Sequence, residues 1–595
     1  MTSNRIRQAN GSGGADPDTG PTGTFSLDGA DSLDGADSLD GADSLDRGDS
    51  LDGADSLDGA DSLDGGDETQ RTAHAEGSDR DYARHADGSR VDRLADILRR
   101  RAAATPGLPA VIEPASTVTT FADLDRRSSQ VAQALLADGV QAGDRVAYIG
   151  VNSPAFLEVL YGAAKIGAIA TAVNNRLTAG EVLRILTDAR PAALVLGAGD
   201  AGLAPEPGAV PSLTRVVTAD SYQAWRDAHP GEDPGVVPDP EDAALIFYTS
   251  GTTGLPKGIM LNGRNLGQAL ATMHYEIELD GTSVAMAPIP YFHISGLGLA
   301  LIAAVNGAAL LLETATSPET LRDLLISRRV SHAVLVPTLI QRLVSLDDIS
   351  GNDWSSLKYV VYGASPIPLP VILRATETIG CRFLQSYGLT ESTGGVTMLR
   401  PEDHLPAPGQ ERRLTSAGRP MPGVPVRVVD PETLQELPAG QRGEVLIGGG
   451  HVMLGYWQRP DETAATLLPG GWLRTGDGGS FDEDGYLYLH DRLKDMIVTG
   501  GENVYPAEVE SVLTAHPAIA EVAVIGRPSP EWGESPHAVV VLRPDSGPTT
   551  PDQIIAFART HLAHYKCPRT VSFTDALPRN ASGKLLKNHL RDKYA

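Results

Sequence analysis

The sequence predicts an α/β protein with a large N-terminal domain, a small α+β C-terminal domain and an acidic, disordered N-terminal tail. Strands and amphipathic helices alternate from about Val91 onward, short strands with turns follow near Val424–Ile447, and a separate set of elements begins near Leu493. A chain of 595 residues is long enough for several domains. We therefore expect a tail and linker over 1–90, a large domain over 91–492 and a small domain over 493–595.

An acidic repeat dominates the first 67 residues. The unit that begins as Ser26-Leu-Asp-Gly-Ala-Asp31 occurs seven times, and this segment holds 16 acidic side chains against three arginines, which accounts for −13 of the net charge of −27. Each unit offers a single leucine to a core. That apolar area is too small to offset the entropy cost of ordering, so we predict disorder. The repeated aspartates also suggest calcium binding, although the nine-residue calcium-binding repeat is richer in glycine.

Hydrophobic periodicity predicts the elements of the large domain. Val91–Ala104 and Phe121–Leu136 have helical spacing, Arg145–Ile149 and Ala192–Leu196 are typical of buried strands, and Ser153–Ile166 is a helix between them. Strands and helices that alternate in this way form parallel α/β layers. We expect such layers here.

The small domain has its own set of expected elements. Pro506–Ala515 and Pro551–Leu562 have helical patterns, whereas Val522–Ile525 and His537–Leu542 are short apolar runs typical of strands. Helices and strands in this order predict an α+β unit.

Composition excludes several classes of protein. The N-terminus lacks the apolar segment of a signal peptide, and the uncharged run Gly296–Leu312 is too short to span a membrane and is broken by Asn306-Gly307. We expect a buried helix and strand there, and a cytoplasmic protein whose peripheral contact with a membrane stays open. Cys381 and Cys567 are too few for a disulfide framework or a cysteine metal site, so we expect buried thiols. An acidic chain without a basic face does not predict nucleic-acid binding.

The most informative segment lies between Tyr248 and Gly258 and follows a predicted strand, Ala243–Phe247. Glycines allow a tight turn whose N–H groups approach an anion, hydroxyl side chains add donors, and a lysine adds positive charge. We therefore predict a loop that holds the phosphates of a nucleotide. Its residues are Thr249, Ser250, Gly251, Thr252, Thr253, Gly254 and Lys257.

This loop resembles the phosphate loop of the adenylate-forming superfamily, which contains acyl-CoA synthetases, luciferases and peptide-synthetase adenylation domains. The resemblance continues to the C-terminus through Gln385–Glu391, Thr475-Gly-Asp477, Asp491-Arg492 and Pro578–Lys584, and is closest to bacterial fatty-acid–CoA ligases. It implies α/β layers with a small β-barrel-like part, and a mobile C-terminal domain.

The resemblance also implies roles for individual residues. Tyr387 stacks on adenine, Thr390 contacts the α-phosphate, Glu391 helps to hold Mg²⁺, and Asp477 with Arg492 binds the ribose. Gly363, Ala364 and Ser365 belong to the implied loop that lines the adenine and the acyl pocket, and Gly388 is a further implied nucleotide-binding residue. The implied catalytic set comprises Lys584, Glu391, Lys257 and Thr249.

Four further positions belong to the implied movement between half-reactions. Lys494 matches the hinge between the domains, Gly500 and Gly501 match the loop that lines the pantetheine tunnel, and Lys584 bridges the substrate carboxylate and the nucleotide. Lys584 offsets charge as the carboxylate attacks the α-phosphorus.

The implied acyl pocket includes His293, which we expect either to gate the carboxylate site or to pack beneath it. Its other expected members are Ile294, Gly296, Gly394 and Gly395. The chain departs from the family pattern at Asn262-Gly263, where Thr-His is usual. This difference affects either the pocket, and with it the substrate class, or only the start of a helix.

We interpret the sequence as that of an AMP-forming acid–thiol ligase that uses ATP, Mg²⁺ and CoA on a fatty or aryl carboxylic acid. The main alternative is an adenylating ligase with another acceptor: a carrier-protein thiol, an amine or nitrite. A non-enzymatic scaffold with an acidic binding tail is a second alternative, but retention of Lys257, Glu391, Asp477, Arg492 and Lys584 argues against it.

Overall fold

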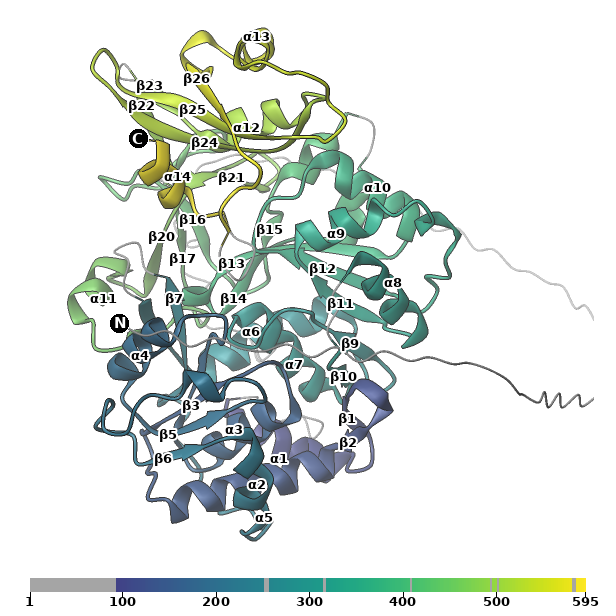
Figure 1. The fold of residues 1–595 in the computed structure, drawn as a ribbon, viewed down its shortest axis with the longest axis vertical. Helices are drawn as coiled ribbons and strands as arrows, with labels where there is room; N and C mark the ends of the chain where they lie inside the picture. The colour runs from purple at the N-terminus through teal and green to yellow at the C-terminus, as the bar shows by residue number, and fades with distance from the viewer. Residues whose placement is uncertain are drawn as a thin grey trace, which may run out of the picture. The chain divides into compact units, whose positions relative to one another are not determined.

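The structure is a computed structural model that describes residues 92–250, 256–313, 317–406, 409–492, 495–499, 502–579 and 585–594. The acidic repeats, with the disorder and calcium binding considered for them, lie outside these residues. Among the described residues are four sheets with helices packed on them (Figure 1).

The first sheet contains the parallel strands expected from the sequence. β3 lies inside the sheet between β4 and β5, and its alternate residues face two different cores. Val146 and Tyr148 pack on the side of α3 (Pro154–Lys165), whereas Ala147 and Ile149 pack with residues of α4 (Ala179–Ala189). A parallel sheet covered on both faces buries consecutive residues in this way. Its order is β18 (Gly455–Tyr456), β8 (Pro256–Asn262), β7 (Ala243–Ser250), β4 (Ile169–Val173), β3 (Arg145–Ile149), β5 (Pro191–Leu196) and β6 (Arg215–Val217).

The second sheet is parallel through its middle and antiparallel at both ends. Helices α8, α9 and α10 contribute to the core on one of its faces. Its order is β15 (Arg419–Pro420), β14 (Gly394–Leu399), β13 (Arg382–Leu389), β12 (Tyr359–Gly363), β11 (His332–Leu335), β9 (Val284–Met286), β10 (Ala309–Leu311), β1 (Pro109–Ile112) and β2 (Val118–Thr120).

Helices of the large domain begin and end at local signals. Ser153 and Thr178 cap α3 and α4 by accepting a backbone N–H, and glycines at 307 and 380 end α7 and α10 with a positive φ. The helices are α1 (Leu94–Ala104), α2 (Phe121–Ala137), α3 (Pro154–Lys165), α4 (Ala179–Ala189), α5 (Ala219–Asp227), α6 (Gly263–Ile277), α7 (Ile294–Asn306), α8 (Pro318–Ser327), α9 (Pro337–Val344), α10 (Leu369–Ile379) and α11 (Pro460–Thr466).

The expected small β part is an antiparallel sheet. Its five described strands are β16 (Val426–Val429), β17 (Gly443–Ile447), β20 (Trp472–Phe481), β19 (Leu467–Leu468) and β21 (Leu487–Arg492). β20 pairs with three of the others, so it carries its Thr475-Gly-Asp477 segment at the centre of this sheet.

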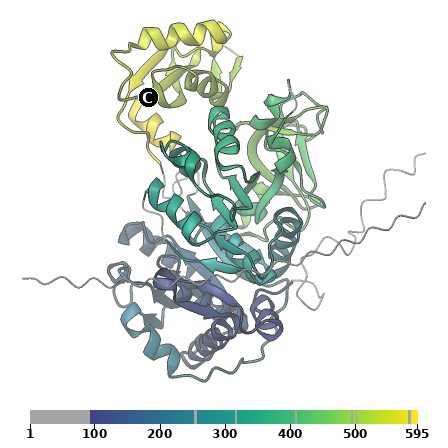
Figure 2. The ribbon, with the colours of Figure 1, turned by 90° about the vertical axis from the view of Figure 1, so that its right-hand side faces the viewer.

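The C-terminal residues form a small α+β domain, coloured yellow-green to yellow in Figure 2. The two faces of β24 pack differently: Val524 lies in a core with α12 and α13, whereas Ala523 and Ile525 pack with Leu590 of α14. Its strands are β23 (Glu502–Val504), β22 (Ile497–Thr499), β25 (Gly533–Leu542), β24 (Ile519–Ser529) and β26 (Thr570–Phe573), and its helices are α12 (Pro506–Thr514), α13 (Pro551–His561) and α14 (Lys587–Tyr594).

The predicted elements are confirmed, with differences at their ends. Strands β24 and β25 extend well beyond the short apolar runs seen in the sequence, because they pair with each other as one long hairpin. The run Gly296–Leu312 contains the buried helix α7 followed by strand β10, as expected. The boundaries at 90 and 492 stay predictions.

The two cysteines differ in burial. Cys567 is buried in the small-domain core, whereas Cys381 is half-buried at the start of β13. Burial raises the pKa of the Cys381 thiol to about 12, so this thiol is protonated at neutral pH.

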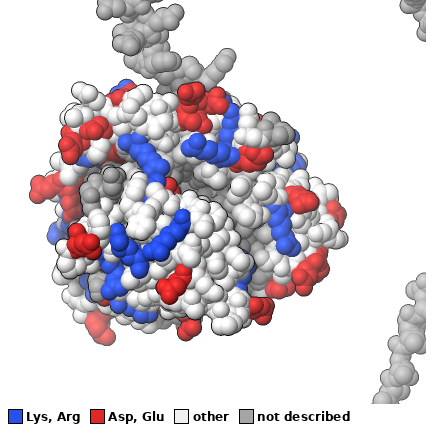
Figure 3. Space-filling model, turned by 90° about the horizontal axis from the view of Figure 1, so that it is seen from above, with Lys and Arg blue, Asp and Glu red and all other residues white. Residues whose placement is uncertain are grey.

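The surface of the described residues carries charged side chains of both signs (Figure 3). Lysine and arginine side chains are interspersed with acidic ones on the face seen in Figure 3. Within the part of the chain that the structure describes, no helix has the length and apolar character needed to cross a membrane.

Candidate active site

The phosphate-loop segment connects two antiparallel strands. Thr249, near the end of β7, lies opposite Lys257, near the start of β8, so both residues flank the base of the loop. Four of its residues, Gly251, Thr252, Thr253 and Gly254, and the side chain of Ser250 lie outside the described residues. The strand pair therefore brings the expected threonine and lysine together at one sheet position.

Lys257 is surrounded by residues far away in the sequence. Its ammonium forms an ion pair with Glu462 of α11 and lies 5.1 Å from the centre of the Tyr456 ring, a cation–π contact. The lysine side chain is 18% exposed. It is thus placed at the surface of the site with both an acidic and an aromatic partner.

Glu391 lies in a tight turn that follows β13. Thr390–Ser392 form a single 3₁₀ turn, and Thr393 ends it with a φ of 55°. The Ser392 hydroxyl donates to the carbonyls of Leu389 and Gly394, at 3.1 and 2.9 Å. A polar side chain that bonds its own turn in this way holds the backbone in a fixed conformation.

Tyr456 links this turn to the phosphate-loop lysine. Its hydroxyl donates to Oε1 of Glu391 at 3.1 Å, and the same ring lies under the Lys257 ammonium. Burial, followed by the nearby Glu391 carboxylate, raises the pKa of Tyr456, so the phenol stays protonated and acts as a donor. The amide of Met453 adds a hydrogen bond of 2.9 Å to the Glu391 carbonyl.

Tyr387 and Asp477 meet directly. The Tyr387 hydroxyl donates to Oδ2 of Asp477 at 2.8 Å, although the two residues come from different sheets. Asp477 lies opposite Arg492 across strands β20 and β21; the side chain of Arg492 lies outside the described residues. The aromatic ring and the carboxylate expected at the adenine and the ribose are therefore neighbours.

The end of β12 lies against the same strand. Gly363 pairs with Ser386, and a Cβ atom on Gly363 would lie 2.2 Å from the Ser386 carbonyl oxygen. Ala364 follows with a φ of 65°, a left-handed conformation that is costly for alanine. Ser365 continues the same loop. This strained backbone lies one strand away from Tyr387.

Three glycines allow the backbones of β13 and β14 to approach closely. A Cβ atom on Gly388 would lie 1.8 Å from the Gly394 carbonyl oxygen, and one on Gly395 would lie 2.1 Å from the Ser386 hydroxyl. Gly394 has a φ of 103° and faces the Ile294 side chain, with 3.8 Å between a built Cβ and Cγ1 of Ile294. The structure thus brings Ile294 and Gly394 together, and their role in an acyl pocket stays a prediction.

Gly296 has a packing role. A Cβ atom there would lie 2.6 Å from the Ile289 carbonyl oxygen and 2.7 Å from that of Pro290. Helix α7 can therefore begin beside the segment that precedes it only because position 296 has no side chain.

His293 precedes α7 and is half-buried. Burial, with a smaller contribution from the charge of Arg176, lowers the pKa of His293 to about 4. Its Nε2 is buried without a hydrogen bond from another described residue, and its ring lies 4.6 Å from that of Phe292. The imidazole is therefore neutral at physiological pH.

The departure at Asn262-Gly263 lies at a helix start. The Asn262 side chain accepts a hydrogen bond from the Asn265 amide and caps α6, and Asn262 is only 2% exposed. A Cβ atom on Gly263 would lie 2.0 Å from the Asp92 carbonyl oxygen. Close packing against the first described residues explains the glycine, so the second of our two interpretations is supported.

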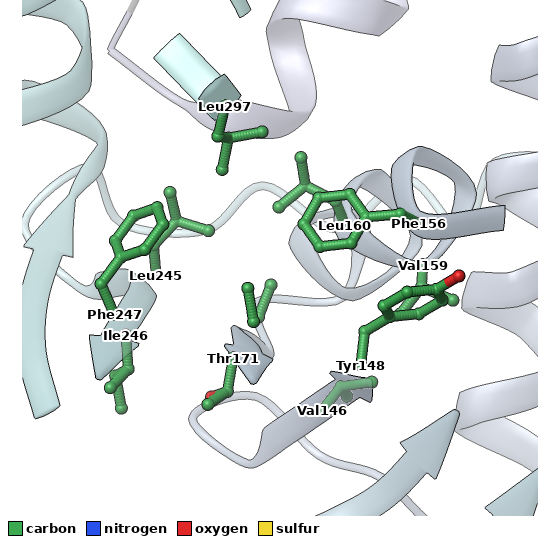
Figure 4. Close-up of a pocket in the computed structure, with 12 residues that line it drawn as sticks. Val146, Tyr148, Phe156, Val159, Leu160, Thr171, Leu245, Ile246, Phe247 and Leu297 are labelled. Atoms are coloured by element: carbon green, nitrogen blue, oxygen red, sulfur yellow. The ribbon is translucent and has the colours of Figure 1, made fainter. Parts of the chain in front are cut away.

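A small apolar cavity lies between α3, α7 and strands β3, β4 and β7 (Figure 4). Its volume is about 10 Å³, enough for at most one water molecule. Leu297 and Leu160 reach it from the helices, and Phe247 reaches it from the sheet. It is a packing gap within the core and does not hold an acyl chain.

Besides the four residues of the phosphate loop, four more expected residues of the site lie outside the described residues: Lys494, Gly500, Gly501 and Lys584. Two residues that sequence reasoning missed are Tyr456 and Glu462. Neither belongs to a periodic pattern, and each acts on a partner more than 60 positions away. Both residues can be noted in the sequence after Gly455 as an aromatic and an acidic side chain, but the sequence does not identify their partners.

Two family models match almost the whole described chain. Residues 98–457 match the family described as AMP-binding enzyme, and residues 508–584 match the AMP-binding enzyme C-terminal domain. The second match confirms a small C-terminal domain of this family.

Individual relatives give the same result. The chain is 39% identical over 496 residues to a fatty acid–[acyl-carrier-protein] ligase, ScoC, of Streptomyces coeruleorubidus, covering 82% of this chain and 94% of the relative. It is 37% identical to a feruloyl-CoA synthase of an Amycolatopsis species, covering 83% and 98%. The solved structure of a Mycobacterium tuberculosis fatty acyl CoA synthetase matches with a TM-score of 0.69 at 34% identity, covering 84% of this chain and 98% of that one.

Proposed function

The chain belongs to the AMP-binding family of adenylate-forming, acyl-activating ligases, and from this premise we propose that it converts a fatty or aryl carboxylic acid to its CoA thioester. In the first step the acid attacks the α-phosphorus of ATP, which gives an acyl-adenylate and releases pyrophosphate. In the second step the CoA thiol attacks the acyl carbonyl and AMP leaves.

The observation that carries this proposal is the convergence of two pairs of residues. Lys257 and Glu391 are joined through Tyr456, and Tyr387 and Asp477 are joined by a direct hydrogen bond. An ammonium suits the phosphates of a nucleotide, and an aromatic ring beside a carboxylate suits its base and ribose. Together they fit ATP better than any single motif does.

Magnesium fits this donor set. No cluster of three or more His, Cys, Asp or Glu side chains that could bind a metal occurs among the described residues. Mg²⁺ needs no such cluster, since one carboxylate with substrate phosphates and water suffices. Glu391 would hold it, and the bound ion would neutralise phosphate charge. Tyr456 orients the Glu391 carboxylate for this contact.

The acyl group would lie where His293, Ile294 and Gly394 approach one another. Neutral His293 places no charge beside an apolar tail, while its unpaired Nε2 remains able to contact a carboxylate. Ile294 supplies apolar surface, and Gly394 leaves space opposite it. These features support an apolar acid, either aliphatic or aromatic.

A second candidate acceptor is the thiol of a carrier protein. ScoC, at 39% identity, is named for transfer of a fatty acid to an acyl-carrier protein, whereas the feruloyl relative is named for a CoA ester. Both acceptors attack the acyl-adenylate through a thiol. The adenylation half-reaction is common to the two candidates.

The test is acid-dependent release of pyrophosphate over a panel of fatty and aryl acids. Each reaction is run with CoA, with a phosphopantetheinylated carrier protein, and with neither, and mass spectrometry identifies the product. An acyl-CoA product supports the proposal and identifies the acid. Acylation of the carrier protein alone would move the proposal to the second candidate. No pyrophosphate with any acid would contradict both.

Lys584 separates the two half-reactions. We expect Lys584→Ala to lower acid-dependent pyrophosphate release by at least about 100-fold, because a charge that stabilises the transition state is lost. Thioester formation from supplied acyl-adenylate should be retained. Lys587→Ala, a change to a lysine on α14, serves as the control. Equal loss of both half-reactions in the Lys584 variant would remove this assignment.

A further inference from the structure

The partner of the phosphate-loop lysine is an unexpected acidic residue. Lys257 is expected to bind phosphates, yet its ammonium is paired with the carboxylate of Glu462 on α11. Oε2 of Glu462 is buried and accepts no hydrogen bond from any other described residue. The lysine is thus the main partner of this buried carboxylate oxygen.

The position of Glu462 is supported by a chain of contacts. Its Oε1 lies 3.7 Å from the Arg459 guanidinium, and Arg459 pairs with Oδ1 of Asp188 at 2.6 Å. The Tyr248 hydroxyl donates to Oδ2 of the same aspartate at 2.7 Å. Since Tyr248 belongs to β7, these contacts tie α11 to the strand that leads into the phosphate loop.

A carboxylate in this place opposes the binding of an anion. It neutralises the lysine that the phosphates need, and its own charge repels them. The Glu462 side chain is 37% exposed, so it can turn into solvent once the lysine has another partner. A partly exposed ion pair of this kind can be replaced by the phosphates of a nucleotide, which carry more negative charge than one carboxylate.

We propose that Glu462 is an internal counter-ion of Lys257 that the phosphates of ATP displace on binding, and that it re-forms the pair when pyrophosphate leaves. The proposal rests on the function proposed above for Lys257 and adds a residue that tunes nucleotide affinity. Glu462 is a positioning residue, since it acts on the nucleotide through the lysine.

The test compares Glu462→Gln with Asp461→Asn, which removes the same charge from the exposed neighbour on α11. The dissociation constant of ATP is measured by calorimetry, and the KM for ATP and kcat are measured from pyrophosphate release. We expect Glu462→Gln to tighten ATP binding about three- to fivefold at low salt, with Asp461→Asn unchanged. The gain should shrink as ionic strength rises.

Measuring Glu462→Gln in a Lys257→Met variant distinguishes competition for the lysine from direct repulsion between Glu462 and the phosphates. In Lys257→Met, the further change Glu462→Gln should alter ATP affinity less than about twofold, because the competed cation is gone. A full gain in that background would show that Glu462 acts on the phosphates directly and would overturn the counter-ion role. Unchanged or weaker ATP binding in Glu462→Gln alone, with an unchanged melting temperature, would overturn it as well.

The results that would contradict the counter-ion role of Glu462 differ from those that would contradict the proposed function. Wild-type protein that neither binds ATP nor releases pyrophosphate contradicts both. Wild-type protein that does both, with Glu462→Gln indistinguishable from Asp461→Asn, contradicts the counter-ion alone. If Glu462→Gln unfolds, Glu462→Ala is measured in its place with the same expected direction.

Discussion

The contacts of Lys257 and those of the Tyr387–Asp477 pair differ in kind. Lys257 is held by an ion pair and an aromatic ring, and both can be exchanged for phosphate or solvent. Tyr387 and Asp477 are held by a direct hydrogen bond beside two strands that leave no room for a Cβ atom at Gly388. One region is therefore set by side-chain charges, and the other by the close packing of two strands.

This difference suggests how one site can both bind and release a nucleotide. Under the proposed function, the Tyr387–Asp477 surface for the base and ribose is formed before binding, which lowers the entropy cost of binding. Exchangeable charges at the phosphates allow pyrophosphate to leave after the first step. Substitutions in the charged region and in the closely packed region should therefore have different effects.

The largest effect should come from the charged region. Glu391→Gln should lower acid-dependent pyrophosphate release by about 100-fold or more, because a metal-bound carboxylate is worth several kcal/mol in such a reaction. The fold should be unchanged, since the amide can still accept the Tyr456 hydroxyl. Activity is measured against Glu377→Gln on the exposed side of α10. A loss below tenfold would remove Glu391 from the metal site.

The region where β13 and β14 pack closely should be disrupted by adding a side chain that the two backbones cannot accommodate. Gly388→Ala would bring Cβ within 1.8 Å of the Gly394 carbonyl oxygen, so β13 and β14 must separate. We expect a loss of about 1–3 kcal/mol in unfolding free energy and an activity about 10- to 100-fold lower. Gly180→Ala in α4, where no atom lies within 4 Å, is the control and should be neutral or stabilising. Wild-type stability in Gly388→Ala would contradict the strand packing described here.

Loss of charge at Asp477 should have an intermediate effect. Asp477→Asn keeps an acceptor for Tyr387 but weakens the hydrogen bonds expected to the ribose, so ATP affinity should fall about tenfold. In contrast to the Glu462 change, this loss should depend little on salt. Calorimetry with Asp484→Asn, an exposed carboxylate in a turn, provides the comparison. If the loss of ATP affinity in Asp477→Asn disappears at high salt, the two regions do not differ in the way described here.

The smallest effect concerns pH. The pKa of His293 is lowered to about 4 from an ordinary 6.5, so its neutral form predominates at any pH well above 4 and its protonation is reached only as pH falls toward 4. Activity between pH 6 and 8 should not follow the titration of this residue. The pH profile of His293→Gln should have the shape of the wild-type profile, whatever the change in its absolute rate. A limb near pH 6.5 that only the wild type shows would contradict the neutral imidazole.

Burial of His293 also affects stability. Because the unfolded chain binds a proton near pH 6.5 and the folded one does not, protonation favours unfolding as pH falls from about 6.5 to 4. Denaturant unfolding of wild type and His293→Gln at pH 7 and pH 5 measures this contribution directly. The difference between the two proteins should change with pH in favour of the glutamine variant at pH 5.

The order of residues along the chain is enough to predict most elements of the fold and to recognise the motifs of the central segments. Strands such as Arg145–Ile149 and helices such as Phe121–Leu136 follow from local periodicity, which depends only on neighbouring residues. The phosphate loop and the Gln385–Glu391 segment could be recognised because their functional residues are adjacent in the chain. The family assignment followed from these segments and is confirmed.

The residues that contact these segments from distant parts of the chain can be identified only in the folded protein. Tyr456 contacts Glu391 although the two residues are 65 positions apart. Glu462 forms an ion pair with Lys257 from helix α11, which has no recognisable motif near it. The need for glycine at 263 and 296 is explained only by the carbonyl oxygens of other segments that lie against these positions. The physical reason is that ion pairs, aromatic contacts and close backbone approaches depend on distances in the folded chain, whereas periodicity and motifs are properties of neighbours in the sequence.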